Sequence, residues 1–209
     1  MGLIKGAVNL TRYWLAENPT EIGDDYVAER LQGNAFLDIE ATTEEEAIGW
    51  VDALNPMTTR FEPQDFNFGQ VMIFGLRLDT RRVSGKTLNR YLALAEMQAR
   101  QTGDRPLSVE QRRQLKVKVR LDLLARTPVS TDVHEVCWFP DRREVWLTGA
   151  GTKAREKFED LWRRTFGLGL IMKIPFILAR EMLPADLDPR SLEEASPSAL
   201  LAGGRREPA

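Results

Sequence analysis

The sequence predicts an α+β fold with an antiparallel or mixed sheet, a pair of long charged helices and a C-terminal amphipathic helix. Three observations predict this class. Stretches with strand periodicity and stretches with helix periodicity do not alternate strictly, unlike those of a doubly wound parallel fold. A long basic segment carries a helix-capping signal. The most regular amphipathic stretch follows a predicted β-hairpin.

The composition is that of a chain with a substantial core. Of the 209 residues, 43% are hydrophobic, and five Trp and nine Phe supply bulk. We expect a folded region over residues 1–183, as one domain or two small lobes, and a flexible tail over residues 184–209. No apolar run reaches the ~20 residues that cross a bilayer. With no signal-peptide pattern and the single cysteine Cys137, we expect a cytoplasmic protein.

The first third is predicted to begin with a strand and a helix. Residues 3–15 show imperfect strand alternation and end before an Asn-Pro pair. Residues 24–36 read as a short helix, with Asp24 or Asp25 as its cap and Gly33 near its end. The "TTEEE" that follows is predicted to form a solvated first helical turn, because carboxylates are favoured there. The "AIGWVDAL" after it is predicted to be extended.

The middle of the chain begins with the clearest strand and a helix. Residues 66–82 are apolar on both faces, which predicts a central strand. Residues 84–103 have helical spacing, a cap at Ser84 and a stop at Gly103.

The basic stretch 108–126 is ambiguous in period, and we favour a helix. Alternating apolar and basic residues suit a strand, whereas the Ser108–Gln111 capping box and Pro128 bound a helix. Such a helix has two apolar stripes and is expected to be contacted on two sides. One stripe is Leu115, Val119 and Leu123; the other is Val117, Leu121 and Leu124, with Arg113, Lys116 and Arg120 between the stripes.

The last part is predicted to form a hairpin, a helix, a strand and a short helix. The hairpin covers residues 131–150 and turns at "PDRRE". Residues 151–167 form the amphipathic helix, with Thr152 as cap and Gly167 as stop. "LGLIMKIPF" is predicted to be a strand, and "PFILAREML" a short helix.

The charge is distributed unevenly. Residues 1–76 contain 4 basic and 13 acidic side chains, whereas residues 77–126 contain 13 basic and 5 acidic ones. A basic block inside a chain of net charge −2 is a local field that can attract an anionic partner, although basic side chains also serve simply to solvate helices.

Several segments of this chain resemble the recombination-associated protein RdgC family. They are "AIGWV", "LRLDTRRVSGKTLNRYLALAE", "LSVEQRRQLKVKVRLDLLARTPVSTDVHEVCWF" and "EVWLTGAGTKAREKFEDLWRRTFGLGLIMKIPF". The match extends over residues 3–176. The resemblance implies a nucleoid-associated protein that binds double-stranded DNA with little sequence preference. It also implies a dimer closed around the duplex that restrains the RecA recombinase, with no cofactor and no catalytic residue.

The basic block supplies the candidate DNA-binding residues. Lys and Arg displace counterions from phosphates, and the chain has no recognisable motif for reading base edges. We therefore expect sequence-independent binding to double-stranded DNA. The expected DNA-binding residues are Arg81, Arg82, Lys86, Arg112, Arg113, Lys116, Lys118, Arg120, Arg126 and Lys153.

Other chemistry is less favoured. The glycine loop 148–154 lacks P-loop spacing and reads as an ordinary turn, with Lys153 as a secondary phosphate contact. His134 and Cys137 fall on opposite strand faces and are interpreted as structural. A metal nuclease built on Asp38, Glu40 and Asp79 has no supporting motif, so no metal is expected. Four aromatics that could stack on single-stranded bases are assigned to the core: Trp138, Trp146, Trp162 and Phe166.

The leading hypothesis is a non-enzymatic homodimer that binds duplex DNA and modulates homologous recombination. A metal-dependent nuclease is the first alternative. The second is a protein-interaction module whose basic face meets an acidic partner, including its own acidic first third.

Overall fold

The computed structural model describes residues 9–17, 22–102, 107–184, 188 and 190–194. The chain divides into two compact units, Met1–Ile171 and Met172–Ala209. Among the described residues, the first contains five helices and the sheet except for Met172, the last residue of its sixth strand, and the second contains two short helices. The predicted α+β class is confirmed.

The sheet has six strands in the order β2-β3-β4-β5-β1-β6, and its long pairs are antiparallel. β3 pairs with β2 on one side and β4 on the other, so the strand with two apolar faces is central as predicted. The strands are β1 (Leu10–Leu15), β2 (Glu46–Val51), β3 (Met72–Thr80), β4 (Ser130–Phe139), β5 (Glu144–Thr148) and β6 (Leu170–Met172).

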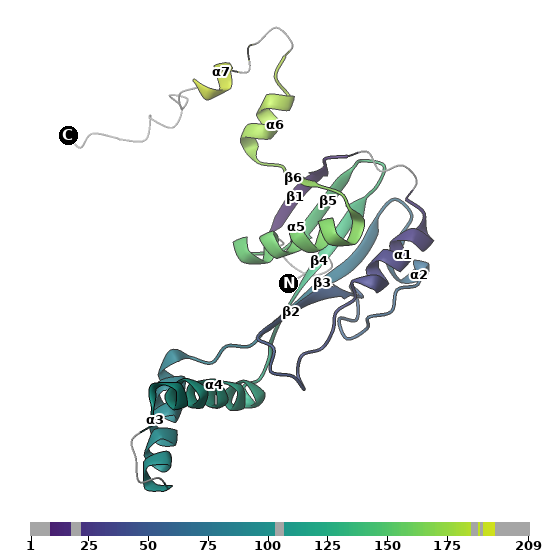
Figure 1. Cartoon of the computed structure of the whole chain (residues 1–209). Helices are drawn as coiled ribbons and strands as arrows, with labels where there is room; N and C mark the ends of the chain where they lie inside the picture. Colours follow the sequence, from purple (N-terminus) through teal and green to yellow (C-terminus); the bar gives the residue numbers. More distant parts are fainter. Residues whose placement is uncertain (1–8, 18–21, 103–106, 185–187, 189, 195–209) are drawn as a thin grey trace, which may run out of the picture. The chain divides into compact units, whose positions relative to one another are not determined.

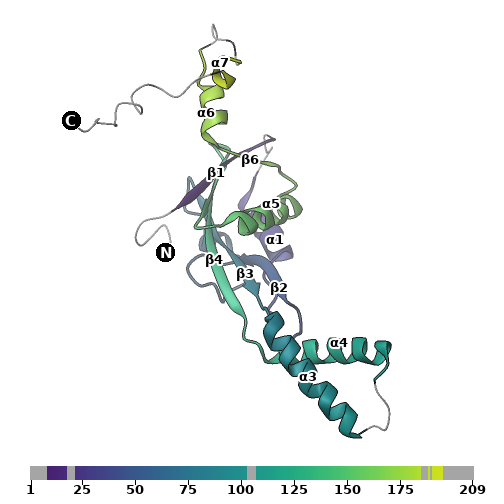
Figure 2. The same cartoon turned by 90° about the vertical axis from the view of Figure 1, so that its left-hand side faces the viewer.

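The helices of the first unit form two groups. In both views α1 (Asp24–Gly33) and α5 (Thr152–Phe166) lie on the same face of the sheet (Figures 1 and 2). The long helices α3 (Gly85–Thr102) and α4 (Val109–Arg126) pack as a hairpin inserted between β3 and β4 (Figure 1). The short helices are α2 (Pro63–Phe66) in the first unit, and α6 (Pro175–Glu181) and α7 (Arg190–Glu193) in the second.

An aromatic cluster joins α5 to the sheet. The Trp162 ring centroid lies 5.0 Å from that of Trp138 on β4 and 4.6 Å from that of Phe166. Trp50 of β2 contacts the same cluster and donates a 2.8 Å hydrogen bond from Nε1 to Thr165 Oγ1. All of these side chains are buried. The amphipathic face predicted for α5 therefore packs on the sheet as expected. Of the four aromatic residues assigned to the core from the sequence, Trp138, Trp162 and Phe166 are buried there.

The basic stretch is a helix, as favoured. Its predicted capping box is present: Gln111 N donates to Ser108 Oγ over 3.2 Å, and Ser108 N donates to Gln111 Oε1 over 2.8 Å. Two donors at the helix start are thereby satisfied within four residues of chain, independently of the tertiary fold.

The "TTEEE" prediction is wrong. Thr42 and Glu45 are bends, Thr43 and Glu44 have no regular structure, and Glu46 begins β2. Arg81 N donates to Glu45 O over 2.8 Å, which extends the pairing of β2 with β3 beyond the Glu46–Thr80 pair. The Arg81 side chain also binds Thr42 O, a carbonyl that a helix would use internally. Long-range hydrogen bonds to Arg81 therefore override a local preference.

Smaller differences concern caps and boundaries. Gly23 rather than Asp24 or Asp25 occupies the N-cap of α1, and both Asp24 carboxylate oxygens accept from Asn67 Nδ2. Gly151 rather than Thr152 caps α5, whereas Gly167 ends the helix as predicted, in a left-handed conformation. The last predicted strand is only Leu170–Met172, because α6 starts at Pro175.

Parts of several predictions lie outside the described residues. These parts are residues 3–8 of the first strand, the Asn-Pro pair at 18–19 that follows it, the stop at Gly103 and most of the proposed tail, of which Arg190–Glu193 forms α7. In the described part of the chain no helix is both long and apolar enough to cross a membrane.

Replacing Gly49 by Ala is expected to destabilise the fold by roughly 2 kcal/mol or more. A Cβ at this position of β2 would overlap the backbone of Phe36, which bridges to the same strand. Urea unfolding measures the loss.

Gly33→Ala is the matched control, because a Cβ there meets nothing within 4 Å. Equal stability of the Gly49→Ala and Gly33→Ala proteins would contradict the close packing of Phe36 on β2.

Candidate nucleic-acid interface

Four of the predicted basic residues share one side of α4. Arg112, Lys116 and Arg120 are spaced four residues apart, and Arg113 lies next to them. All four side chains are exposed. At 1.5 Å per residue the row from Arg112 to Arg120 spans about 12 Å. We call these four residues the α4 basic row.

The end of the row meets the acidic part of the chain. Arg120 Nε donates to Glu45 Oε1 over 3.1 Å, and both side chains are about half exposed, at 52% and 46%. An exposed pair of this kind contributes about 0–1 kcal/mol and is screened by salt. Glu45 therefore reduces the free positive charge at Arg120 without removing the side chain from solvent.

Arg81 does not belong to the binding surface. It is 2% exposed, and its guanidinium donates to four backbone carbonyls. A side chain so enclosed is out of reach of a phosphate, so its assignment as a DNA-binding residue is corrected. The sequence offered no signal for this burial, because the acceptors lie about 40 residues away on either side of it.

Three cations lie where β3 leads into α3. Arg82 and Lys86, both predicted, are exposed. Arg90, which the sequence reasoning left out of the site, is exposed one turn beyond Lys86 on α3. The i, i+4 spacing of Lys86 and Arg90 was the signal that could have identified it.

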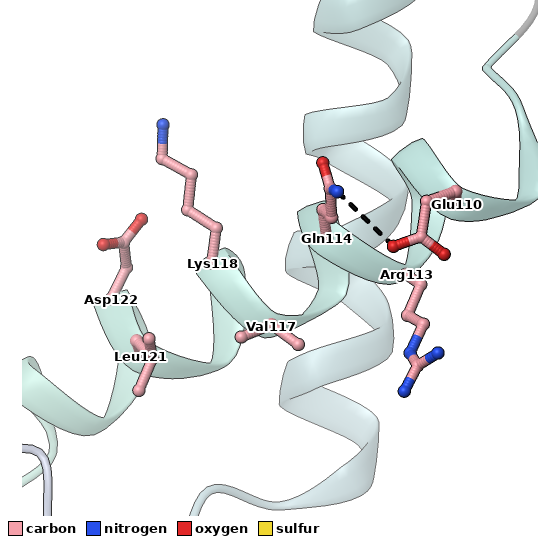
Figure 3. A pocket seen from close by; sticks show the side chains of 7 residues that line it. All are labelled: Glu110, Arg113, Gln114, Val117, Lys118, Leu121 and Asp122. Carbon is pink, nitrogen blue, oxygen red and sulfur yellow. Dashed lines mark hydrogen bonds between the residues drawn. The ribbon is translucent and has the colours of Figure 1, made fainter.

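The remaining predicted cations lie elsewhere. Lys118 and Arg113 project from opposite sides of α4 (Figure 3). Arg126 lines a groove of about 270 Å³ between α4 and α3. Lys153 is exposed in the first turn of α5, on a different element. The structure thus gathers four of the ten predicted residues into one row.

The second apolar stripe of α4 is only partly covered. Val119 of the first stripe is buried beside α3, whereas Val117 and Leu121 are 54% and 43% exposed. A groove of about 610 Å³ runs along them (Figure 3). The helix was predicted to be contacted along both apolar stripes. Within the described chain, Leu124 is the one residue of the second stripe that is buried. The groove is lined by Glu110, Arg113, Gln114, Val117, Lys118, Leu121 and Asp122.

The carboxylates considered for a nuclease come close together. Asp38, Glu40 and Asp79 line a pocket of about 340 Å³. Both Asp79 oxygens accept from Arg77, over 2.9 Å from Nε and 2.7 Å from Nη2. These hydrogen bonds raise the pKa of Arg77 above its ordinary value. Arg77 thus neutralises the innermost carboxylate.

Within the ranges that the structure describes, no three His, Cys, Asp or Glu side chains are arranged to hold an ion.

His134 and Cys137 lie on opposite faces of β4, as predicted. His134 Nδ1 lies 3.0 Å from Thr148 O, with which it is hydrogen-bonded, and Cys137 is buried. Burial, with a smaller contribution from the charge of Glu135, raises the pKa of the Cys137 thiol to about 12. A protonated, enclosed thiol is a poor nucleophile, so this pair has no catalytic arrangement.

Trp146 differs from the other questioned aromatics. It is partly exposed on the sheet face away from α5, and the Arg12 guanidinium lies 5.6 Å from its ring centroid. Its Nε1 donates to Glu144 over 3.0 Å. The assignment of Trp146 to the core therefore holds only in part.

A family model described as "Putative exonuclease, RdgC" matches residues 8–180. This chain belongs to the RdgC family. The match includes the whole sheet and the α3–α4 hairpin, which agrees with the resemblance noted in the sequence. No curated protein matches the chain.

The stability of this RdgC-family protein is expected to fall above about pH 8.5, in part through Cys137. The unfolded thiol ionises near pH 8.5, whereas the buried one stays protonated to about 12. A thiol whose pKa is raised by folding contributes its full stabilisation below the pKa of the unfolded thiol and loses it as the pH rises above that value. By pH 9.5 the free energy of unfolding is therefore lower by about 1 kcal/mol.

Urea unfolding of wild type and Cys137→Ala at pH 7.5 and 9.5 measures this loss. The variant should lose less stability than wild type over that interval. Parallel losses in the two proteins would show that Cys137 does not contribute.

Proposed function

We propose that this protein binds double-stranded DNA without sequence preference and modulates homologous recombination as a non-enzymatic homodimer. The observation that carries the proposal is the α4 basic row, Arg112, Arg113, Lys116 and Arg120, exposed along one side of a helix. Association with the nucleoid and restraint of the RecA recombinase on DNA are proposed from the family resemblance.

The chemistry of the row suits phosphates rather than bases. Long basic side chains neutralise phosphate charge and release counterions, and this term does not depend on sequence. If the four cations each engage one phosphate, log affinity falls with log salt at a slope of about −4. Arg82, Lys86 and Arg90 are additional exposed cations that would steepen the slope if they join.

The α4 groove supports self-association. Val117 and Leu121 form an exposed apolar centre flanked by both acidic and basic residues. The lining of the groove carries two acidic and two basic side chains, Glu110, Asp122, Arg113 and Lys118, so a second copy of the groove offers charges of either sign. A two-fold interface requires such self-complementarity.

The nuclease alternative has one favourable observation, the shared pocket of Asp38, Glu40 and Asp79. The ion pair with Arg77 opposes it, because a cation already occupies the Asp79 carboxylate. The interaction-module alternative has the Arg120–Glu45 contact in its favour, although this single exposed pair leaves the rest of the row available.

Reversing the α4 basic row to Glu is expected to lower affinity for a labelled duplex at least a hundredfold at 100 mM salt. The reason is the loss of about four phosphate contacts and their replacement by repulsion. Fluorescence anisotropy measures binding, and circular dichroism confirms the fold.

The matched control reverses Arg60, Arg142, Arg163 and Arg164, which are exposed elsewhere and give the same change in net charge. Equal affinities of the two quadruple variants would remove the row as the site. Incubating the wild type and the labelled duplex with Mg²⁺ or Mn²⁺ should leave the duplex intact; shortened product would favour the nuclease.

Replacing Leu121 by Asp is expected to convert a dimer to a monomer of 23.8 kDa, because it places a charge at the centre of the apolar groove. Size-exclusion chromatography with light scattering measures the mass.

Leu37→Asp is the matched control, since Leu37 is 78% exposed in a loop outside the groove. A Leu121→Asp protein that remains dimeric would place the dimer contact on another surface.

A further inference from the structure

Arg81 joins three segments that are distant in sequence. Its Nη1 donates to Thr42 O over 2.6 Å and to Leu124 O over 3.1 Å. Its Nη2 donates to Ile39 O and Glu40 O, each over 3.1 Å. One buried guanidinium thus connects the end of β3, the loop before β2 and the last turn of α4.

The position of these carbonyls gives the contact its strength. Leu124 lies in the last turn of α4, where its carbonyl accepts from the N–H of the C-cap residue Thr127 over 3.1 Å and contributes to the negative end of the helix dipole. A cation at this end is favourable, and the planar guanidinium can reach several acceptors at once. Lys, with a single nitrogen, cannot reproduce this geometry.

The rest of the hairpin base is held by few contacts. Leu124 is buried beside the loop, and Arg120 forms its exposed pair with Glu45. Because α3 begins four residues after Arg81, the same residue lies at the entry to the hairpin and binds its exit. The direction in which α4 leaves the sheet therefore depends on this side chain.

We propose that Arg81 is a positioning residue that orients the α3–α4 hairpin, and with it the α4 basic row, without contacting DNA. This inference rests on the proposed function for its effect on binding, but not for its effect on the hairpin. A hairpin that spends only a tenth of its time correctly oriented would bind about tenfold more weakly.

Positioning and phosphate contact predict different salt behaviour. Removing a phosphate contact lowers the slope of log affinity against log salt by about 0.9. Removing a positioning residue weakens binding at every salt concentration and leaves the slope unchanged, because the same phosphates are engaged in the bound state. The slope therefore separates phosphate contact from positioning, and hydrogen exchange separates positioning from general destabilisation of the fold.

The experiment compares wild type, Arg81→Met, Arg81→Lys and Arg82→Met. Duplex affinity is measured by anisotropy between 50 and 300 mM salt, and hydrogen exchange by mass spectrometry in the absence of DNA. Arg82 is the matched control, since it is the exposed neighbour and undergoes the same chemical change.

For Arg81→Met we expect about tenfold weaker binding with the wild-type slope. Exchange should be faster in residues 85–102 and 109–126 and unchanged in β3 and β4. Arg81→Lys keeps the charge and part of the contacts, so its affinity and exchange should be intermediate. Arg82→Met should keep wild-type exchange.

Three results would overturn the proposal. They are a slope reduced by about 0.9 in Arg81→Met with unchanged exchange, faster exchange throughout the sheet, and wild-type values of both measurements. If the wild-type protein does not bind duplex DNA, the proposed function fails. The hydrogen-exchange rates of the α3–α4 hairpin in Arg81→Met then still show whether Arg81 orients the hairpin.

Discussion

Packing of α5 on the sheet is the interaction on which the rest of the structure depends. Trp162 contacts rings from β2, β3 and β4, so one helical side chain joins three neighbouring strands. The largest fully buried side chains of the described chain include Trp50, Phe74, Trp138 and Trp162, which all meet at this interface. Trp50 adds a polar constraint, because its buried N–H needs the Thr165 hydroxyl and fixes the position of α5 along the sheet.

The α3–α4 hairpin is built differently from this core. Its two helices bury a narrow apolar seam against each other and leave aromatic and aliphatic side chains exposed, among them Tyr91, Leu94 and Met97. A hairpin with so little burial of its own depends on its attachment to the domain. The attachment is polar: Arg81 binds the carbonyls of α4 and of the acidic loop, and Glu45 reaches Arg120. The proposed binding row is therefore carried on an element whose orientation is set by hydrogen bonds.

The acidic first third has a structural role beside this hairpin. Glu45 pairs with Arg120 of α4, and the adjacent Glu46 pairs with Lys157 of α5. Adjacent residues near the start of β2 thus reach both helical groups of the domain. The opposite charges that separate along the sequence meet at this point in space. Arg112, Arg113 and Lys116 of the α4 basic row stay exposed beside this contact.

The sequence by itself determined the elements whose signals are local. The Ser108–Gln111 box, the helix stop at Gly167 and the doubly apolar β3 each have their determinants within one segment, and each was predicted correctly. Only the tertiary structure decided that Arg81 is buried, that "TTEEE" is not helical and that most of the second stripe of α4 is exposed. Burial of a cation depends on acceptors some 40 residues away, and exposure of Val117 depends on which helices lie alongside. A one-dimensional pattern records the chemistry of a side chain but not its neighbours, so it identified the basic block and not which cations face solvent.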